Sequence, residues 1–178
     1  SHGKTTTTSL TAAALAAGGL DPTVIVGGKV LALGTGAVLG GGEWLVAEAD
    51  ESDGTFLRLV PTVAVVTNID HEHVDHYPEL ADLRRAFTDF LARVPFYGTA
   101  IVCADDPEVR TLAADLDRRV VRYGLAREAD VRADLATLTT GPSGQHVTVL
   151  AADEPLGELR LPQAGRHNLR NALAAVAV

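Results

Sequence analysis

The sequence begins with residues that could bind a polyphosphate. Gly3, Lys4 and Thr5 form a Gly-Lys-Thr triplet in front of a Thr- and Ala-rich stretch that predicts a helix over residues 5–17. Backbone N–H groups at a helix N-terminus and a nearby lysine attract phosphate oxygens, while the threonine hydroxyl can ligate Mg²⁺. A triplet this short also occurs in ordinary surface loops, so other residues must support the assignment.

A group of carboxylates lies at the end of an apolar run. Glu48, Asp50, Glu51 and Asp53 stand in the stretch "VAEADESD", which closes a strand expected over residues 44–50. Ligands of α/β sheets bind at the carboxyl ends of parallel strands, and Mg²⁺ prefers oxygen ligands. A magnesium site is therefore expected here, with a solvated acidic loop as the alternative.

The next apolar run, residues 62–70, leads into "TNIDHEHVDHY" (67–77). Three of the six histidines of the chain lie in this stretch, which favours an active-site loop. Two alternatives stay open, the solvated N-terminus of a helix and a zinc site. The zinc ligands would come from His71, His73, His76 and Asp75.

The last polar group is "GRHNLRN" (165–171) at the start of an expected helix. Asn168 and Asn171 are three positions apart, so a helix would place them on one face. Their amides could read the edge of a purine, and Arg166 and His167 suit phosphate contact or base stacking. An ordinary helix start with surface polar residues is the alternative.

Alternating strands and helices should position these groups. Strands are expected over 23–28, 44–50, 62–70, 99–104 and 119–124, with helices over 78–94 and 105–116. That order is typical of a parallel sheet covered on both faces. We therefore divide the chain into a parallel α/β core (1–129), an antiparallel meander (130–162) forming a small appended sheet, and the start of a helix (163–178).

Composition narrows the class of protein. The net charge of −8 and the lack of a Lys/Arg run argue against a nucleic-acid partner. No stretch approaches the roughly 20 apolar residues of a membrane span. Cys103 is the only cysteine, which excludes an internal disulfide and a cysteine-based zinc cluster, so a reducing, cytoplasmic setting fits best.

Taken together, "HGKTTTT", "AEADESD", "TNID", "DDP" and "GRHN" resemble, in order and spacing, the central ATP-binding domain of the Mur ligases. These are ATP-dependent, amide-forming enzymes of peptidoglycan synthesis. The resemblance implies a P-loop-type, mostly parallel sheet flanked by helices. It also implies that residues 1–178 are a fragment without the UDP-sugar domain, the amino-acid domain and the strand before the phosphate loop, and that the fragment alone is not a competent ligase.

The resemblance also implies residue roles. Lys4, Glu48 and His73 would be catalytic, with Lys4 on the γ-phosphate of ATP. Thr5 and Glu48 would hold one Mg²⁺ and His73 a second, although the family often has aspartate where this chain has Glu72. The remaining contacts to ATP would come from His2, Gly3, Thr6, Asn68, His167, Asn168 and Asn171.

The implied reaction phosphorylates the lactyl carboxylate of UDP-N-acetylmuramate, after which the amine of L-alanine attacks the acyl phosphate. A murein tripeptide is an alternative second substrate, disfavoured by Ser52 where a tyrosine is expected. Folylpolyglutamate synthesis is less consistent with "AEADESD". Outside the ligases, a non-catalytic nucleotide-binding module and a metal-binding module remain alternatives.

Overall fold

The computed structural model describes residues 1–27, 36–70 and 76–178. Its elements, in chain order, are α1 (Lys4–Ala17), β1 (Thr23–Ile25), β2 (Ala37–Val38), β3 (Leu45–Ala47), the 3₁₀ helix η1 (Thr55–Arg58), β4 (Val63–Val66), α2 (Leu80–Ala92), β5 (Thr99–Cys103), α3 (Pro107–Ala114), β6 (Val120–Gly124), β7 (Val131–Gly141), β8 (Gly144–Ala151), β9 (Glu154–Leu161) and α4 (Arg166–Val176). Within this described part of the chain, no helix has the length and apolarity that a membrane crossing requires.

The main sheet has six strands in the order β4-β5-β6-β7-β8-β9. The pairings from β4 to β7 are parallel, whereas β7–β8 and β8–β9 are antiparallel. The predicted meander therefore exists, but it extends the main sheet instead of forming a separate one. The reason is that Tyr123 and Gly124 of β6 pair with Val131 and Arg132 of β7, so backbone hydrogen bonding continues across the junction.

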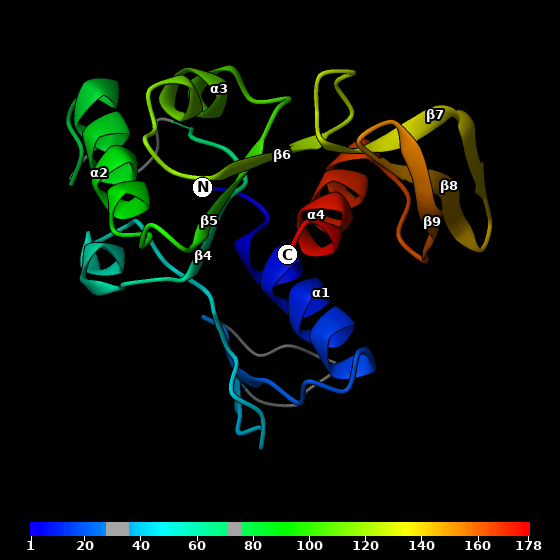
Figure 1. Ribbon diagram of the computed structural model, residues 1–178, viewed down its shortest axis with the longest axis horizontal. Coiled ribbons are helices and arrows are strands. Elements are labelled where there is room, and N and C mark those ends of the chain that lie inside the picture. The colour runs from blue at the N-terminus through cyan, green and yellow to red at the C-terminus, as the bar shows by residue number, and fades with distance from the viewer. Residues whose placement is uncertain (28–35, 71–75) are drawn as a thin grey trace.

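Helices cover both faces of this sheet, as the α/β pattern predicted (Figure 1). Neighbouring residues of β5 alternate between two cores, because successive side chains of a strand point to opposite faces. Ala100 and Val102 pack in a core with α2 and α3. Ile101 and Cys103 lie in the other core, which includes Leu169 and Leu173 of α4.

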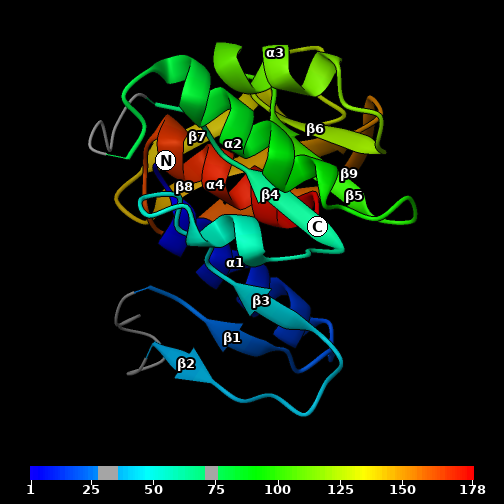
Figure 2. The same cartoon turned by 90° about the vertical axis from the view of Figure 1, so that its left-hand side faces the viewer.

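A second, three-stranded sheet has the order β2-β1-β3 and lies beside α1 (Figure 2). Val24 and Val26 share a small core with Ala12 of α1. The expectation that residues 44–50 form a strand buried on both faces was wrong, because Leu45 is 59% exposed. β3 lies at one edge of this small sheet and, within the described residues, pairs on one side only, with β1.

Local sequence explains where the helices begin. Glu79 and Asp82 form a reciprocal capping box at the start of α2, and Leu83, Phe87 and other apolar residues at helical spacing turn inward. Asp106 caps α3 by accepting a hydrogen bond from the Val109 N–H, with Pro107 in the first turn. Both helices are therefore anchored by side chains near the carboxyl ends of the strands.

Candidate nucleotide site

The residues before α1 form a tight loop clamped by the segment after β4. Gly3 has φ +80°, a left-handed conformation that favours glycine, and α1 begins at Lys4. The Asn68 side chain accepts a hydrogen bond from the His2 N–H (2.7 Å) and donates one to the His2 carbonyl (2.9 Å). The loop is thus preorganised with the N-terminus of a fourteen-residue helix behind it, which suits an anion.

Lys4 is held by acids of the segment that follows β3. Its Nζ lies 2.9 Å from Glu51 Oε2 and 3.7 Å from Asp50 Oδ1, and it also donates to the Ser1 carbonyl. Burial by itself raises the pKa of Glu51, but the Ser1 amine and Lys4 outweigh it and bring the pKa below its ordinary value of 4.5. The carboxylate of Glu51 is therefore charged at neutral pH beside the lysine.

Thr5 and Glu48 bring their oxygen atoms together, as a shared cation would require. The Thr5 hydroxyl lies 3.0 Å from both carboxylate oxygens of Glu48, and the Gly27 N–H donates to Glu48 Oε2. A hydroxyl and a carboxylate beside the predicted phosphate loop match the oxygen preference of Mg²⁺. These two residues therefore fit the metal that the sequence predicted for them.

The start of α4 lies against the same loop. α1 and α4 pack side by side (Figure 1), and a Cβ built on Gly3 would lie 2.5 Å from Asn171 Oδ1. Asn168 lies nearby, with its amide nitrogen donating to the Ala164 carbonyl at 2.9 Å. The helix therefore presents its amides beside the loop that Gly3 and Lys4 form.

A cavity of about 490 Å³ lies between these parts. The predicted ATP-contacting residues that line it are His2, Gly3, Thr6, Asn68, His167, Asn168 and Asn171. Lys4 is among the residues around a different cavity, while Thr5 faces Glu48. The fold thus brings most of the predicted set together, and their contact with ATP stays a prediction.

Most of the histidine-rich stretch cannot be placed in the site. His73, together with the other residues of 71–75, lies outside the described residues, so its predicted metal and catalytic roles stay predictions. His76 is described, and its ring meets Tyr77 edge-on with centroids 4.7 Å apart. Among the described residues, no three His, Cys, Asp or Glu side chains gather as they would around a metal ion.

Sequence reasoning missed several residues of the 490 Å³ cavity, namely Thr67, Cys103, Asp105, Asp106, Arg170 and Tyr123. The sequence predicts a helix from residue 105, but no local pattern marks Asp105 as a cavity residue. Burial, together with Cys103 and Asp105, holds the pKa of Tyr123 well above its usual value, so the phenol is neutral. The β-strand order that places β6 beside β5 could not be read from local patterns.

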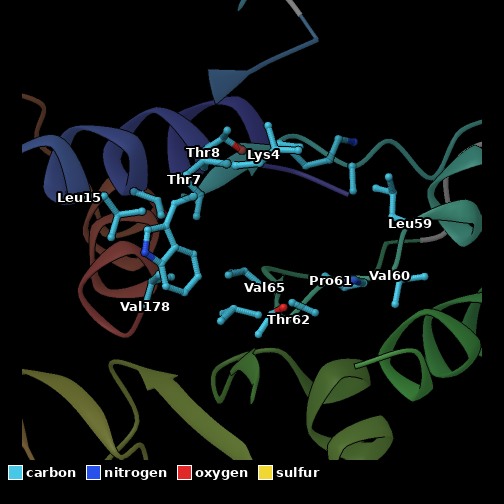
Figure 3. Close-up of a pocket in the computed structure, with 18 of the residues that line it drawn as sticks. Lys4, Thr7, Thr8, Leu15, Leu59, Val60, Pro61, Thr62, Val65 and Val178 are labelled. Carbon is cyan, nitrogen blue, oxygen red and sulfur yellow. The ribbon is translucent and has the colours of Figure 1, made fainter. Parts of the chain in front are cut away.

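A second cavity, of about 600 Å³, separates the two sheets below α1. In Figure 3, Lys4, Thr7, Thr8 and Leu15 of α1 lie along one side of it, and Pro61, Thr62 and Val65 lie along the other. It is mostly apolar, and it is bordered by β3 and β4, each of which lies at one edge of its sheet. The Thr7 hydroxyl is buried and makes no hydrogen bond within the described part of the chain.

Known proteins resemble the chain over its whole length. The family model of the Mur ligase middle domain matches residues 1–178. The UDP-N-acetylmuramate–L-alanine ligase of Phenylobacterium zucineum (strain HLK1) is 54% identical over 183 residues, covering 99% of this chain and 38% of that protein. The chain thus spans well under half the length of the curated relatives that it matches.

Solved structures show the same fold. The UDP-N-acetylmuramate:L-alanyl-gamma-D-glutamyl-meso-diaminopimelate ligase from Neisseria meningitides has a TM-score of 0.86 at 25% identity, over 99% of this chain and 58% of that one. The UDP-N-acetylmuramate-alanine ligase from Thermotoga maritima has a TM-score of 0.82 at 27% identity, over 99% and 39%. With a family match from the first residue to the last and structures this similar, the chain belongs to the Mur ligase family and corresponds to its middle domain.

Proposed function

We propose that the chain is the nucleotide-binding part of an ATP-dependent ligase that joins L-alanine to UDP-N-acetylmuramate. The observation that carries the proposal is the convergence of three segments distant in sequence on one site. These are the Gly3–Thr6 loop, the Glu48–Glu51 acids and the start of α4. The substrates follow from the relatives that are 54% identical and bear that enzyme's name.

The proposed first step moves the γ-phosphoryl group of ATP to a carboxylate of the UDP-sugar, which releases ADP. Lys4 would leave Glu51 and Asp50 to contact the transferring group, and the backbone N–H groups at the start of α1 would hold the phosphates. Thr5 and Glu48 would hold Mg²⁺, which would supply positive charge against the phosphate oxygens. The amine of L-alanine would then displace phosphate from the acyl phosphate to form the amide.

We also propose that a β-strand fills the 600 Å³ cavity in the longer protein. The Ser1 amine donates to the Asn68 carbonyl (2.8 Å) and lies 3.7 Å from Glu51, so it sits just past the carboxyl ends of β4 and β3. A strand that led into Ser1 parallel to both would lie between their unpaired edges. It would join the two sheets, as expected for a phosphate loop that follows a strand.

The test of the ligase uses the complete protein with Mg-ATP and UDP-N-acetylmuramate. Phosphate release is followed with L-alanine in one reaction and with the murein tripeptide in another. Release with L-alanine alone is the expected result. Release with the tripeptide alone would reassign the enzyme to recycling, and ATP binding without release in either reaction would support a non-catalytic nucleotide module.

A further inference from the structure

Asp105, which lines the 490 Å³ cavity, links the segment after β6 to α4. It lies two residues after the end of β5, and its carboxylate is mostly buried, with 12% of the side chain exposed. The backbone N–H groups of Leu125 and Ala126, just after β6, donate to it at 2.8–3.0 Å. The carboxylate is therefore fixed in position by the main chain of a neighbouring strand end.

The same carboxylate also binds α4. Arg170 Nε donates to Asp105 Oδ2 at 2.8 Å, a hydrogen bond between opposite charges. A Cβ on Gly124 would lie only 2.9 Å from Asp105 Oδ1, so the glycine leaves room for this arrangement. Through Asp105, Arg170 is therefore linked to backbone at the end of β6.

This tie acts on the helix that carries the predicted nucleotide contacts. Arg170 precedes Asn171 and follows His167 by three positions, so fixing Arg170 restrains the rotation of the first turns of α4. A second tie holds the N-terminus of the same helix, where the Gln145 amide donates to the Gly165 carbonyl at 3.1 Å. Together the two restraints set how α4 faces Gly3.

We propose that Asp105 is a positioning residue, which through Arg170 holds α4 in the orientation that nucleotide binding needs. Since this inference rests on the proposed nucleotide-binding function, its test needs one measurement with nucleotide and one without. The Asp105 side chain is 12% exposed and that of Arg170 is 41% exposed, so removing Arg170 leaves a mostly buried carboxylate without its charged partner.

The experiment uses the complete protein with the variants Asp105→Asn, Arg170→Gln and the double variant. We expect each single change to weaken Mg-ATP binding about fivefold to tenfold in calorimetric titration, as for a lost charged hydrogen bond. The double variant should bind Mg-ATP no more weakly than either single variant, because all three lose the same Asp105–Arg170 hydrogen bond. Arg170→Lys keeps a donor and should recover most of the affinity.

The nucleotide-free measurement is hydrogen exchange of the peptide containing residues 166–171. It should exchange faster in the Asp105 and Arg170 variants than in the unchanged protein. Arg84→Gln is the matched control, because it breaks an exposed Arg84–Glu108 pair between α2 and α3, away from the cavity. That variant should change neither ATP affinity nor exchange in α4.

Two results would overturn the inference. If Arg170→Gln weakens ATP binding while Asp105→Asn does not, Arg170 contacts the nucleotide directly and Asp105 does not position it. If exchange in α4 is unchanged in both variants, the link does not restrain the helix. Should the unchanged protein bind no ATP, the proposed function fails, whereas the exchange measurement still decides whether Asp105 orients α4.

Discussion

Gly3 and Asn171 lie so close together that no side chain larger than hydrogen fits between them. A Cβ on Gly3 would come within 2.5 Å of Asn171 Oδ1, and Gly3 has φ +80°. The loop before α1 and the start of α4 are thus in direct contact although almost the whole chain separates them. Any larger residue at position 3 should therefore lower stability for two reasons. It would have to adopt a left-handed backbone conformation, and its side chain would clash with Asn171.

Gly3→Ala should therefore destabilise the chain more than left-handed strain alone does. Gly19 is a matched control, because it has φ +79° with nothing within 4 Å of its Cβ position. We expect Gly19→Ala to lower the free energy of unfolding by about 1 kcal/mol and Gly3→Ala by about 2 kcal/mol. Urea denaturation measures both, and equal losses would mean that Asn171 simply moves aside.

Glu48→Gln should impair phosphoryl transfer far more than Asp50→Asn. Glu48 meets the Thr5 hydroxyl at 3.0 Å, whereas Asp50 lies 3.7 Å from Lys4 with 61% of its side chain exposed. Removing the Glu48 charge should cost about a hundredfold in the rate of phosphate release and raise the Mg²⁺ concentration needed. The Asp50 variant should lose less than about tenfold. Steady-state rates of phosphate release, measured in the complete protein over a series of Mg²⁺ concentrations, check this. Equal losses in the two variants would mean that Glu48 has no special role.

The charge of Glu51, held beside the Ser1 amine and Lys4, should make the stability of the 178-residue chain depend on pH in the acidic range. The folded-state pKa of Glu51 is lowered from 4.5, so its contribution is present above that pH and is lost as pH falls through the folded pKa. The unchanged chain should be more stable than Glu51→Gln at pH 6–7, and the difference should shrink below about pH 4.5. Thermal unfolding across this range checks it, with exposed Glu128→Gln as the control. A difference independent of pH would contradict the charge assignment.

Thr7→Val should stabilise the 178-residue chain by about 1 kcal/mol, because it removes a buried hydroxyl that has no hydrogen bond within the described residues. Thr88→Val is the control, since the Thr88 hydroxyl already donates to the Arg84 carbonyl on an exposed helix face. Chemical denaturation should show little change for the control. If a strand fills the cavity in the complete protein, Thr7→Val should not stabilise that protein. An equal gain in stability in the 178-residue chain and in the complete protein would argue against the strand.

Local patterns predicted the helices and the strands of the six-stranded sheet well. α2 follows its apolar spacing, and Asp106-Pro107 marks the start of α3. What could not be predicted depends on long-range pairing. β7 continues the parallel sheet because it meets β6, and Leu45 is exposed because β3 borders a cavity.

The residues of the candidate site likewise include some that the sequence predicted and some that only the fold reveals. Residue type and family pattern singled out Thr5, Glu48 and Asn171. The fold brings Thr5 against Glu48 and Asn171 against Gly3, and their roles at a nucleotide stay predictions. Asp105 could not be predicted, because its contacts depend on β5, the segment after β6 and α4 meeting at one point. Chemistry visible in a motif can be read locally, whereas a residue that acts by holding other elements in place is visible only in the fold.

The edge strand β9 of the six-stranded sheet is unsuited to pairing with another molecule. β9 contains Pro155, which lacks an N–H group, and its register with β8 shifts between Val149 and Leu150. Glu158 and Arg160 add charge along the same strand. Proline, irregular register and charge each discourage edge-to-edge association of sheets. The long antiparallel extension therefore closes the sheet against aggregation at the end farthest from β4.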